Sequence, residues 1–227
     1  MIEFLFLDLD DTILDFRGGE KTAIRQTLQH FGLEPTEDVL AAYHRINDQH
    51  WKQLELGKMT RDQVLTGRFQ VLFSEMGIQA DCSACAKIYM EDLSRCHDFL
   101  PGAKEALERL QKKYRLYLAS NGTASVQHRR IAGAGLAPYF EQIFISQELG
   151  HNKPSRSFFD ACFAKIPGFD PAKAMIVGDS LTSDIQGGIH AGIRTCWVAP
   201  DHAQAPEGLQ PDLRIENLSQ LEALLER

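Results

Sequence analysis

The stretch Phe4-Leu-Phe-Leu-Asp8-Leu9-Asp10-Asp-Thr12 decides the fold of this chain. A short apolar run that stops at a group of aspartates is typical of a buried strand in a parallel sheet, and ligands bind at the carboxyl ends of such strands. Side chains alternate along an extended chain, so Asp8 and Asp10 are expected to face one site while Leu9 packs inward. Two neighbouring carboxylates repel each other unless a cation lies between them. The alternative interpretation is an aspartate-rich turn without a function.

Further short apolar runs predict the other strands of the sheet. They cover residues 114–119, 142–146, 174–177, 195–199 and 213–215. Stretches with helical periodicity lie between most of them, at residues 103–113, 125–134, 155–165, 183–191 and 218–225. Strands and helices in alternation predict an α/β fold, with a Rossmann-like parallel sheet covered by helices on both faces.

Residues 16–97 interrupt this alternation. They contain no strand pattern and four helical stretches, at residues 21–30, 37–56, 61–76 and 83–95, separated by glycine or proline. We therefore expect residues 1–15 and 98–227 to form the core, and residues 16–97 to form an inserted all-helical domain.

Composition excludes several classes of protein. With 44% hydrophobic and 24% charged residues among 227, the chain has an ordinary globular balance that excludes collagen, coiled coil and disorder. The formal net charge is −7, so the chain has no excess of positive charge that would attract the phosphates of a nucleic acid. The apolar runs are too short for a membrane span or a signal peptide. We therefore expect a cytoplasmic protein with neither a membrane nor a nucleic acid as its partner.

The cysteines agree with a reducing compartment. They are odd in number and scattered, at Cys82, Cys85, Cys96, Cys162 and Cys196. Cys82 and Cys85 form a C-x-x-C pair in a predicted helix, without a second pair at zinc-like spacing. Ordinary helix packing and a redox or metal pair both remain open for these two residues.

A second acidic motif follows the predicted strand at 174–177. Gly178-Asp179-Ser180 comes directly after it, and Asp184 lies five residues beyond Asp179. Oxygen ligands without histidine or cysteine nearby suit Mg²⁺. Together with Asp8 and Asp10, this motif predicts the second half of a metal site. Asp184 has an alternative role as the cap of the helix that follows.

Two more motifs lie at predicted strand ends or helix starts. Ser120-Asn121-Gly122 follows the strand at 114–119 and offers a hydroxyl and backbone N–H groups to an anion. Lys153-Pro154 precedes the helix at 155–165, where proline suits the first helical turn and holds the preceding lysine extended. Each is common on its own; in this order they predict a phosphate pocket.

The combination D-x-D-x-T, S-N-G, K-P and G-D-x4-D resembles the haloacid dehalogenase-like hydrolase superfamily over the whole chain. The helical insertion is similar to that superfamily's cap of the first type, and residues 1–15 and 98–227 would then be the catalytic core. The resemblance implies that Asp8 is the nucleophile, which forms an aspartyl-phosphate. It implies that Asp10 is the general acid for the leaving oxygen and then the base for water.

The resemblance also implies how substrate and metal are held. Phosphate is bound by Lys153, which neutralises charge, by the Thr12 and Ser120 hydroxyls, and by the backbone of Asn121 and Gly122. Asp179 ligates Mg²⁺ together with Asp8 and the Asp10 carbonyl, and Asp184 supports the metal shell or Lys153. Dehalogenases of this superfamily lack an aspartate matching Asp10 and use no metal, so a phosphatase is expected. The family often has a second proline after K-P, where this chain has Ser155-Arg156.

Further segments are similar to bacterial pyrimidine 5′-nucleotidases of the superfamily. They include the segment from Trp51 to Gly57, Gly67-Arg68-Phe69, the T-C-W-V run and the Pro206-Glu-Gly turn. This resemblance implies a Mg²⁺-dependent 5′-nucleotidase acting on pyrimidine nucleoside monophosphates, as a monomer or homodimer. Trp51, Phe69 and Phe73 are candidates for stacking on a base or for the core of the cap. A sugar-phosphate or phosphoglycolate phosphatase or mutase remains an alternative, and a non-catalytic phospho-receiver-like switch is a remote one.

Overall fold

The computed structural model describes residues 1–226, and in it the first apolar run forms strand β1 (Phe4–Leu7). Within this part of the chain, β1 lies inside a six-stranded parallel sheet of order β3-β2-β1-β4-β5-β6. The other strands are β2 (Arg115–Ser120), β3 (Gln142–Ile145), β4 (Ala174–Gly178), β5 (Arg194–Val198) and β6 (Leu213–Ile215). Because all pairings are parallel, the strands end at one edge of the sheet. The predicted α/β fold with a Rossmann-like sheet is confirmed.

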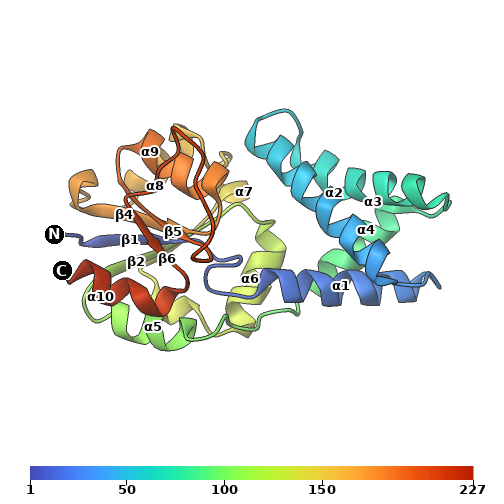
Figure 1. Ribbon diagram of the computed structural model, residues 1–227, viewed down its shortest axis with the longest axis horizontal. Helices are drawn as coiled ribbons and strands as arrows, with labels where there is room; N and C mark the ends of the chain where they lie inside the picture. Colours follow the sequence, from blue (N-terminus) through green and yellow to red (C-terminus); the bar gives the residue numbers. More distant parts are fainter. Residues whose placement is uncertain (227) are drawn as a thin grey trace. The chain divides into compact units, whose positions relative to one another are not determined.

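Helices cover both faces of the sheet (Figure 1). On one side lie α5 (Ala103–Leu110), α6 (Ala124–Gly133) and α10 (Leu221–Leu225). On the other side lie α8 (Arg156–Phe163) and α9 (Gln186–Ala191). Each face has its own core, since alternate residues of a strand point to opposite sides.

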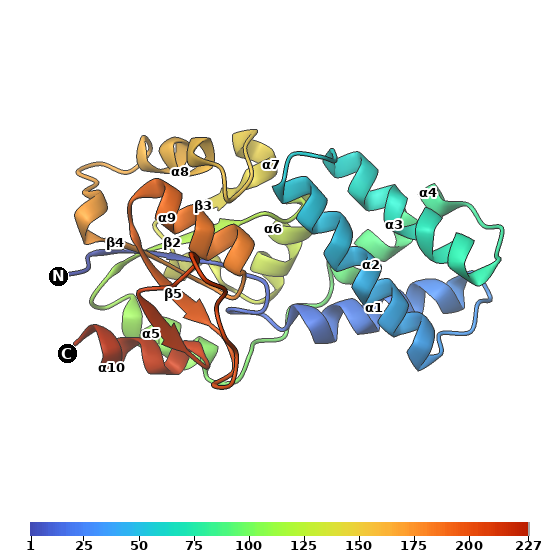
Figure 2. The same cartoon turned by 45° about the horizontal axis from the view of Figure 1, so that its top comes forward.

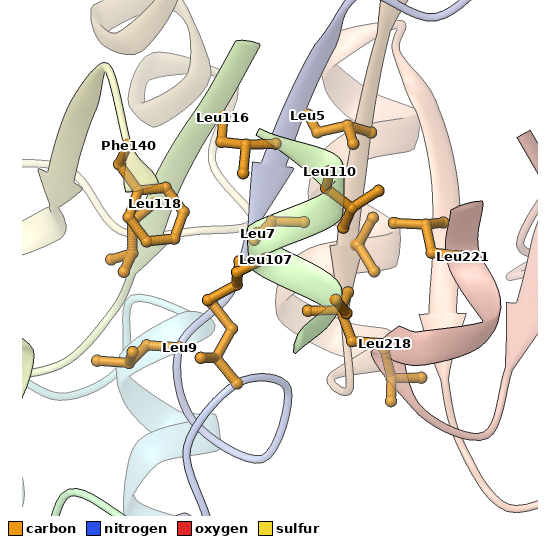
Figure 3. Packing of buried hydrophobic residues seen from close by; sticks show 14 of the residues in the cluster. Leu5, Leu7, Leu9, Leu107, Leu110, Leu116, Leu118, Phe140, Leu218 and Leu221 are labelled. Atoms are coloured by element: carbon orange, nitrogen blue, oxygen red, sulfur yellow. The ribbon is translucent and has the colours of Figure 1, made fainter. Parts of the chain in front are cut away.

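The two cores explain why β1 is apolar along its whole length. Leu5 and Leu7 point into the core that α5 and α10 cover, together with Leu107 and Leu221 (Figure 3). Phe4 and Phe6 point the other way, into a core that holds the buried phenylalanines of α8. Burying one such side chain stabilises the fold by about 1.5–3 kcal/mol. β1 is therefore firmly held where the aspartates begin.

Several helices differ from their predicted form. The predicted helix at 183–191 is a π-helical turn, η3 (Leu181–Ile185), followed by the short α9. The predicted helix at 218–225 is a 3₁₀ turn, η4 (Leu218–Gln220), followed by α10. Helix α8 begins at Arg156 with Ser155 as its N-cap, so Pro154 precedes the helix and is not in its first turn. The short α7 (Ser146–Leu149), η1 (Ala137–Tyr139) and η2 (Pro171–Lys173) were not predicted, since such short segments show no periodicity.

The chain divides into two compact units: Met1–Asp15 with the chain from His97 onward, and Phe16–Cys96. The second unit consists of α1 (Phe16–His30), α2 (Glu37–Glu55), α3 (Arg61–Met76) and α4 (Cys82–Leu93), which Figure 2 shows as a helical bundle. Within it, α1 packs on α4 and α2 on α3. None of the helices in the described residues is long and apolar enough to cross a membrane.

Candidate active site

The loop after β1 turns back on itself within a few residues. Asp8 continues from β1, and its amide donates to the carbonyl of Val177 on the neighbouring β4 at 2.9 Å. Leu9 is fully buried in the core, as the alternation predicts. Asp11 takes a left-handed conformation with φ 54°, which aspartate tolerates better than most residues, and its amide donates to the carbonyl of Leu14. This tight turn holds Asp8 and Asp10 at the carboxyl end of β1.

A buried lysine joins the motifs of three strands. The ammonium of Lys153 donates to Oδ1 of Asp8 at 2.6 Å, to Oδ1 of Asp184 at 2.6 Å and to the carbonyl of Ala119 at 2.7 Å. An ammonium has three N–H donors, so all of them are used within the protein. Burial opposes the charge of Lys153, but Asp184 and Asp8 outweigh it, and its pKa is raised. Lys153 therefore stays protonated.

Asp179 completes an acidic cluster. One carboxylate oxygen from each of Asp8, Asp179 and Asp184 lies within 4.8 Å of the others. Burial, with repulsion from Asp184 and Asp10 added, raises the pKa of Asp8 to about 8 despite Lys153. Burial and the negative charges of Asp8 and Asp184 also raise the pKa of Asp179 well above its ordinary value. The cluster therefore resists carrying its full negative charge.

The donor set of this cluster fits a divalent cation. Three ionised carboxylates and the Lys153 ammonium leave two negative charges, which one divalent ion would balance. Each side chain of the cluster offers a carboxylate oxygen, the ligand type that Mg²⁺ prefers. Asp184 is fully buried, and its Oδ2 accepts from the backbone amide of Ser180 at 3.1 Å. Asp184 is not a helix cap, because Ser180 is the N-cap of η3.

Asp10 is held by two residues that the sequence analysis did not single out. Its Oδ2 accepts from Nε2 of Gln127 at 2.7 Å, and its Oδ1 is paired with Nη1 of Arg130. Both partners are buried residues of α6. They lie three positions apart on the inward face of a helix, where apolar residues are expected. Two polar residues on the inward face of a predicted helix were the signal available in the sequence, but this pattern does not identify the carboxylate that they contact.

The Ser120-Asn121-Gly122 motif closes the other side of the site. The Ser120 hydroxyl accepts from the Gly122 amide at 3.1 Å and from Nε2 of Gln127 at 2.8 Å. Asn121 exchanges two hydrogen bonds with the backbone of Lys153, at 2.8 and 2.9 Å. Gly122 is required for space, because a Cβ there would lie 2.2 Å from the Gln127 side chain. The motif is thus tied to both Lys153 and the partner of Asp10.

The Thr12 hydroxyl is buried and has no hydrogen-bond partner within the described residues. Burying such a group costs free energy unless a ligand or a water molecule bonds to it.

Trp197 of β5, which the sequence did not mark as a site residue, donates from Nε1 to the backbone carbonyl of Asp179 at 2.7 Å. A tryptophan in a strand gives no sequence signal for such a contact.

The aromatic candidates of the helical unit differ in exposure. Phe69 and Phe73 are buried in that unit's own core, where Phe69 contacts Tyr43 and Tyr89. Only Trp51 is partly exposed, with the guanidinium of Arg61 5.5 Å from its ring centre. Stacking of a base on Phe69 or Phe73 would require that core to open.

The C-x-x-C pair shows no activated thiol. Burial raises the pKa of Cys85 to about 11 and also raises that of Cys82. A thiol is reactive and binds metal as the thiolate, which these raised pKa values disfavour. This favours ordinary helix packing for the pair.

Comparison with known proteins agrees with this geometry. The family model of haloacid dehalogenase-like hydrolases matches residues 2–192. HAD-hydrolase YfnB of Bacillus subtilis is 38% identical over 97% of this chain and 94% of its own length. Its crystal structure, bound to magnesium, covers all of this chain and 99% of that one with a TM-score of 0.95 at 37% identity.

Two relatives carry the name of pyrimidine 5′-nucleotidase. PynA of Streptococcus pneumoniae is 38% identical over 96% of this chain and 93% of its own length. YjjG of Escherichia coli is 28% identical over 98% of this chain and 97% of its own length. The family match and the similarity over nearly the full length of these relatives lead to one conclusion: this chain is an enzyme that belongs to the haloacid dehalogenase-like hydrolase family.

Proposed function

We propose that this enzyme is a Mg²⁺-dependent phosphomonoesterase that acts through an aspartyl-phosphate on Asp8, and that its substrates are pyrimidine nucleoside 5′-monophosphates. The observation that carries the proposal is the buried cluster of Asp8, Asp179, Asp184 and Lys153 at the carboxyl ends of neighbouring parallel strands. Phosphoryl transfer depends mainly on positioning and on stabilising charge, and this cluster suits both.

In the first step, a carboxylate oxygen of Asp8 attacks phosphorus as the bond from phosphorus to the ester oxygen breaks. The electron pair of that bond stays on the leaving oxygen, and the carboxyl group of Asp10 donates a proton to it. In the second step, water attacks phosphorus, Asp10 takes the proton from water, and the bond to Asp8 breaks. The nucleophile divides a difficult hydrolysis into two easier displacements.

Hydroxyl groups are available for the phosphate oxygens. A serine hydroxyl has one hydrogen and two lone pairs. Because the Ser120 oxygen already accepts two hydrogen bonds, its own hydrogen is left to donate to a phosphate oxygen. The buried, unpartnered hydroxyl of Thr12 is suited to the same use. Lys153 has no spare donor and would act through its positive charge.

Asp8, Asp179 and the backbone carbonyl of Asp10 would hold Mg²⁺, with Asp184 supporting Lys153 or the metal shell. When bound, the ion would offset the negative charge of the phosphate and of the cluster, and so keep Asp8 ionised. Burial raises the pKa of Asp8, and a cation beside this carboxylate would act in the opposite direction.

The substrate class is supported by relatives. PynA and YjjG are named pyrimidine 5′-nucleotidases, and both are similar to this chain over nearly its full length. A small phosphorylated metabolite in the cytoplasm is thus the expected partner of the site.

A substrate panel tests this function. Phosphate release is measured with Mg²⁺ for uridine, thymidine, cytidine, adenosine and guanosine 5′-monophosphates, for ribose 5-phosphate and for phosphoglycolate. We expect the highest kcat/KM for pyrimidine monophosphates, and loss of activity with a chelator that added Mg²⁺ reverses. A preference for the sugar phosphate or phosphoglycolate would contradict the substrate assignment, and full activity in excess chelator would contradict the metal.

A further inference from the structure

We propose that Gln127 and Arg130 are positioning residues that hold the Asp10 carboxyl group in the orientation needed for proton transfer. The inference rests on the proposed role of Asp10 and concerns two residues of α6 outside the four sequence motifs. Neither residue has to touch the substrate for this role.

The hydrogen bonds form a closed network around the Asp10 carboxylate. Nη1 of Arg130 is paired with Oδ1 of Asp10 and donates to Oε1 of Gln127 at 3.0 Å. Nε2 of Gln127 donates to Oδ2 of Asp10 at 2.7 Å and to the Ser120 hydroxyl at 2.8 Å. Nη1 and Nε2 carry two hydrogens each, so each of these hydrogens has one acceptor. One donor on each carboxylate oxygen fixes the plane of the group as well as its position.

Burial makes this network rigid while leaving Asp10 usable. Arg130 is fully buried and Gln127 is 2% exposed, whereas the Asp10 side chain is 27% exposed. Packing therefore fixes Gln127 and Arg130, whereas the Asp10 carboxyl group that they contact is open to solvent. Each carboxylate oxygen has two lone pairs, so each keeps one for a proton, a substrate oxygen or a water.

Gln127 also contacts a hydroxyl that is proposed to bind phosphate. It bridges Asp10 and Ser120, whose remaining hydrogen faces no acceptor in this network. The Ser120 hydroxyl has a second donor, the Gly122 amide at 3.1 Å, and so keeps a partner when Gln127 is replaced. Gly122 leaves room for Gln127, because a Cβ there would lie 2.2–2.5 Å from three Gln127 side-chain atoms.

A purely structural role is the competing explanation, since the same bonds attach α6 to the loop after β1. The two roles differ in how an effect depends on the leaving group. A nucleoside 5′-oxygen must receive a proton as it departs, whereas p-nitrophenolate is a stable anion that departs without one. The value of kcat/KM covers only the steps up to departure of that group, so later hydrolysis of the phosphoenzyme does not obscure the comparison.

The experiment measures kcat/KM of Gln127→Met and Arg130→Met with uridine 5′-monophosphate and with p-nitrophenyl phosphate, at saturating Mg²⁺. General acid catalysis contributes about 10²–10⁴-fold, so a misplaced donor is expected to lower the value for the nucleotide by about tenfold or more. The value for p-nitrophenyl phosphate is expected to fall much less. Arg130→Lys, which keeps a charged donor, is expected to recover part of the loss. Arg129→Met is the matched control, an exposed arginine of the same helix, and is expected to leave both values unchanged.

A double variant strengthens the test. Once Asp10→Asn has removed the proton donor, adding Gln127→Met is expected to cause little further loss with the nucleotide, because both changes act on one step. If Arg130→Met does not fold, as judged by circular dichroism, Gln127→Met and Arg130→Lys provide the same comparison.

The outcomes separate this inference from the proposed function. Equal losses with both substrates, or no loss with either, would overturn the positioning role while leaving the phosphatase assignment intact. Failure of the unmodified enzyme to hydrolyse either ester would contradict the proposed function itself.

Discussion

At the scale of single residues, the site depends on a few buried polar side chains that satisfy one another. Lys153 uses all three donors on Asp8, Asp184 and a backbone carbonyl, so each of these groups has a fixed position. Breaking a buried ion pair by removing one partner costs about 3–5 kcal/mol, because the other charge is left without compensation. The same residues that suit catalysis therefore also hold the carboxyl ends of three strands together.

Trp197 allows a test of how Asp179, a proposed metal ligand, is held. Trp197→Phe removes the Nε1–H that donates to the Asp179 carbonyl but keeps an aromatic ring in the core. We expect the free energy of unfolding to fall by about 1–3 kcal/mol, since the carbonyl loses its donor in a largely buried place. We also expect a higher Mg²⁺ concentration for half-maximal activity.

Urea unfolding and Mg²⁺ titration measure the two effects. Trp51→Phe is the matched control, because it changes a tryptophan of the helical unit and leaves the Asp179 carbonyl untouched. An unchanged Mg²⁺ requirement in Trp197→Phe would show that this hydrogen bond does not position Asp179.

At the scale of elements, apolar runs locate strands better than periodicity locates short helices. β1 and β6 have the predicted bounds, and the other strands differ from theirs by about a residue, because a buried strand is simply a continuous apolar run. The helix predicted at 183–191 is instead a π turn and a short helix. There Asp184 accepts from Lys153, and such a tertiary contact is invisible to periodicity.

Helix α6 shows that sequence periodicity has the same limit when it is used to predict the site. The sequence places Asp8, Lys153 and Asp184 at predicted strand or helix ends, and the structure brings these three together. Gln127 and Arg130 come close to Asp10 only through the rotation of α6 about its axis, which packing determines. Helical spacing predicts that they share a face, but it does not identify the carboxylate that they meet.

Helix α2 offers a pH-dependent test within the helical unit. Nδ1 of His44 lies 2.6 Å from Oε2 of the buried Glu20, and this hydrogen bond raises the pKa of His44 above its ordinary value of 6.5, against the effect of burial. A raised pKa in the folded state means that the stabilisation is complete below pH 6.5 and is lost as the pH rises through the folded-state value. We expect His44→Gln to lower the free energy of unfolding at pH 5.5 by at most about 1 kcal/mol, since His44 is 41% exposed.

The measurement compares urea unfolding of both proteins at pH 5.5 and pH 9. The difference between His44→Gln and the unmodified protein is expected to shrink at pH 9. His151→Gln, at an exposed position in the other unit, serves as the control. A deficit that is the same at both pH values would show that the charge of His44 does not contribute.

At the scale of the whole molecule, the parallel sheet gathers acidic groups that destabilise one another until a cation is present. Burial, with the repulsion between the carboxylates added, raises the pKa values of Asp8 and Asp179. We therefore expect Mg²⁺ to stabilise the folded protein, by about 2.7 kcal/mol when its concentration is 100 times the dissociation constant. Thermal unfolding with Mg²⁺ and with chelator measures the gain.

The variant Asp179→Asn is the appropriate comparison for this stabilisation. It removes one carboxylate of the cluster and should lose most of the gain from Mg²⁺, while in chelator it should be at least as stable as the unmodified protein, because one of the repelling carboxylates is gone. An equal gain from Mg²⁺ in both proteins would place the stabilising ion elsewhere.

The proposed mechanism depends most on Asp8 as the nucleophile. Asp8→Asn keeps the shape of the side chain and removes the carboxylate that would attack phosphorus. The decisive measurement is phosphate release from uridine 5′-monophosphate by Asp8→Asn with saturating Mg²⁺, with circular dichroism to show that the variant is folded. We predict no turnover above background, against steady turnover by the unmodified enzyme. Substantial turnover by a folded Asp8→Asn would contradict the account.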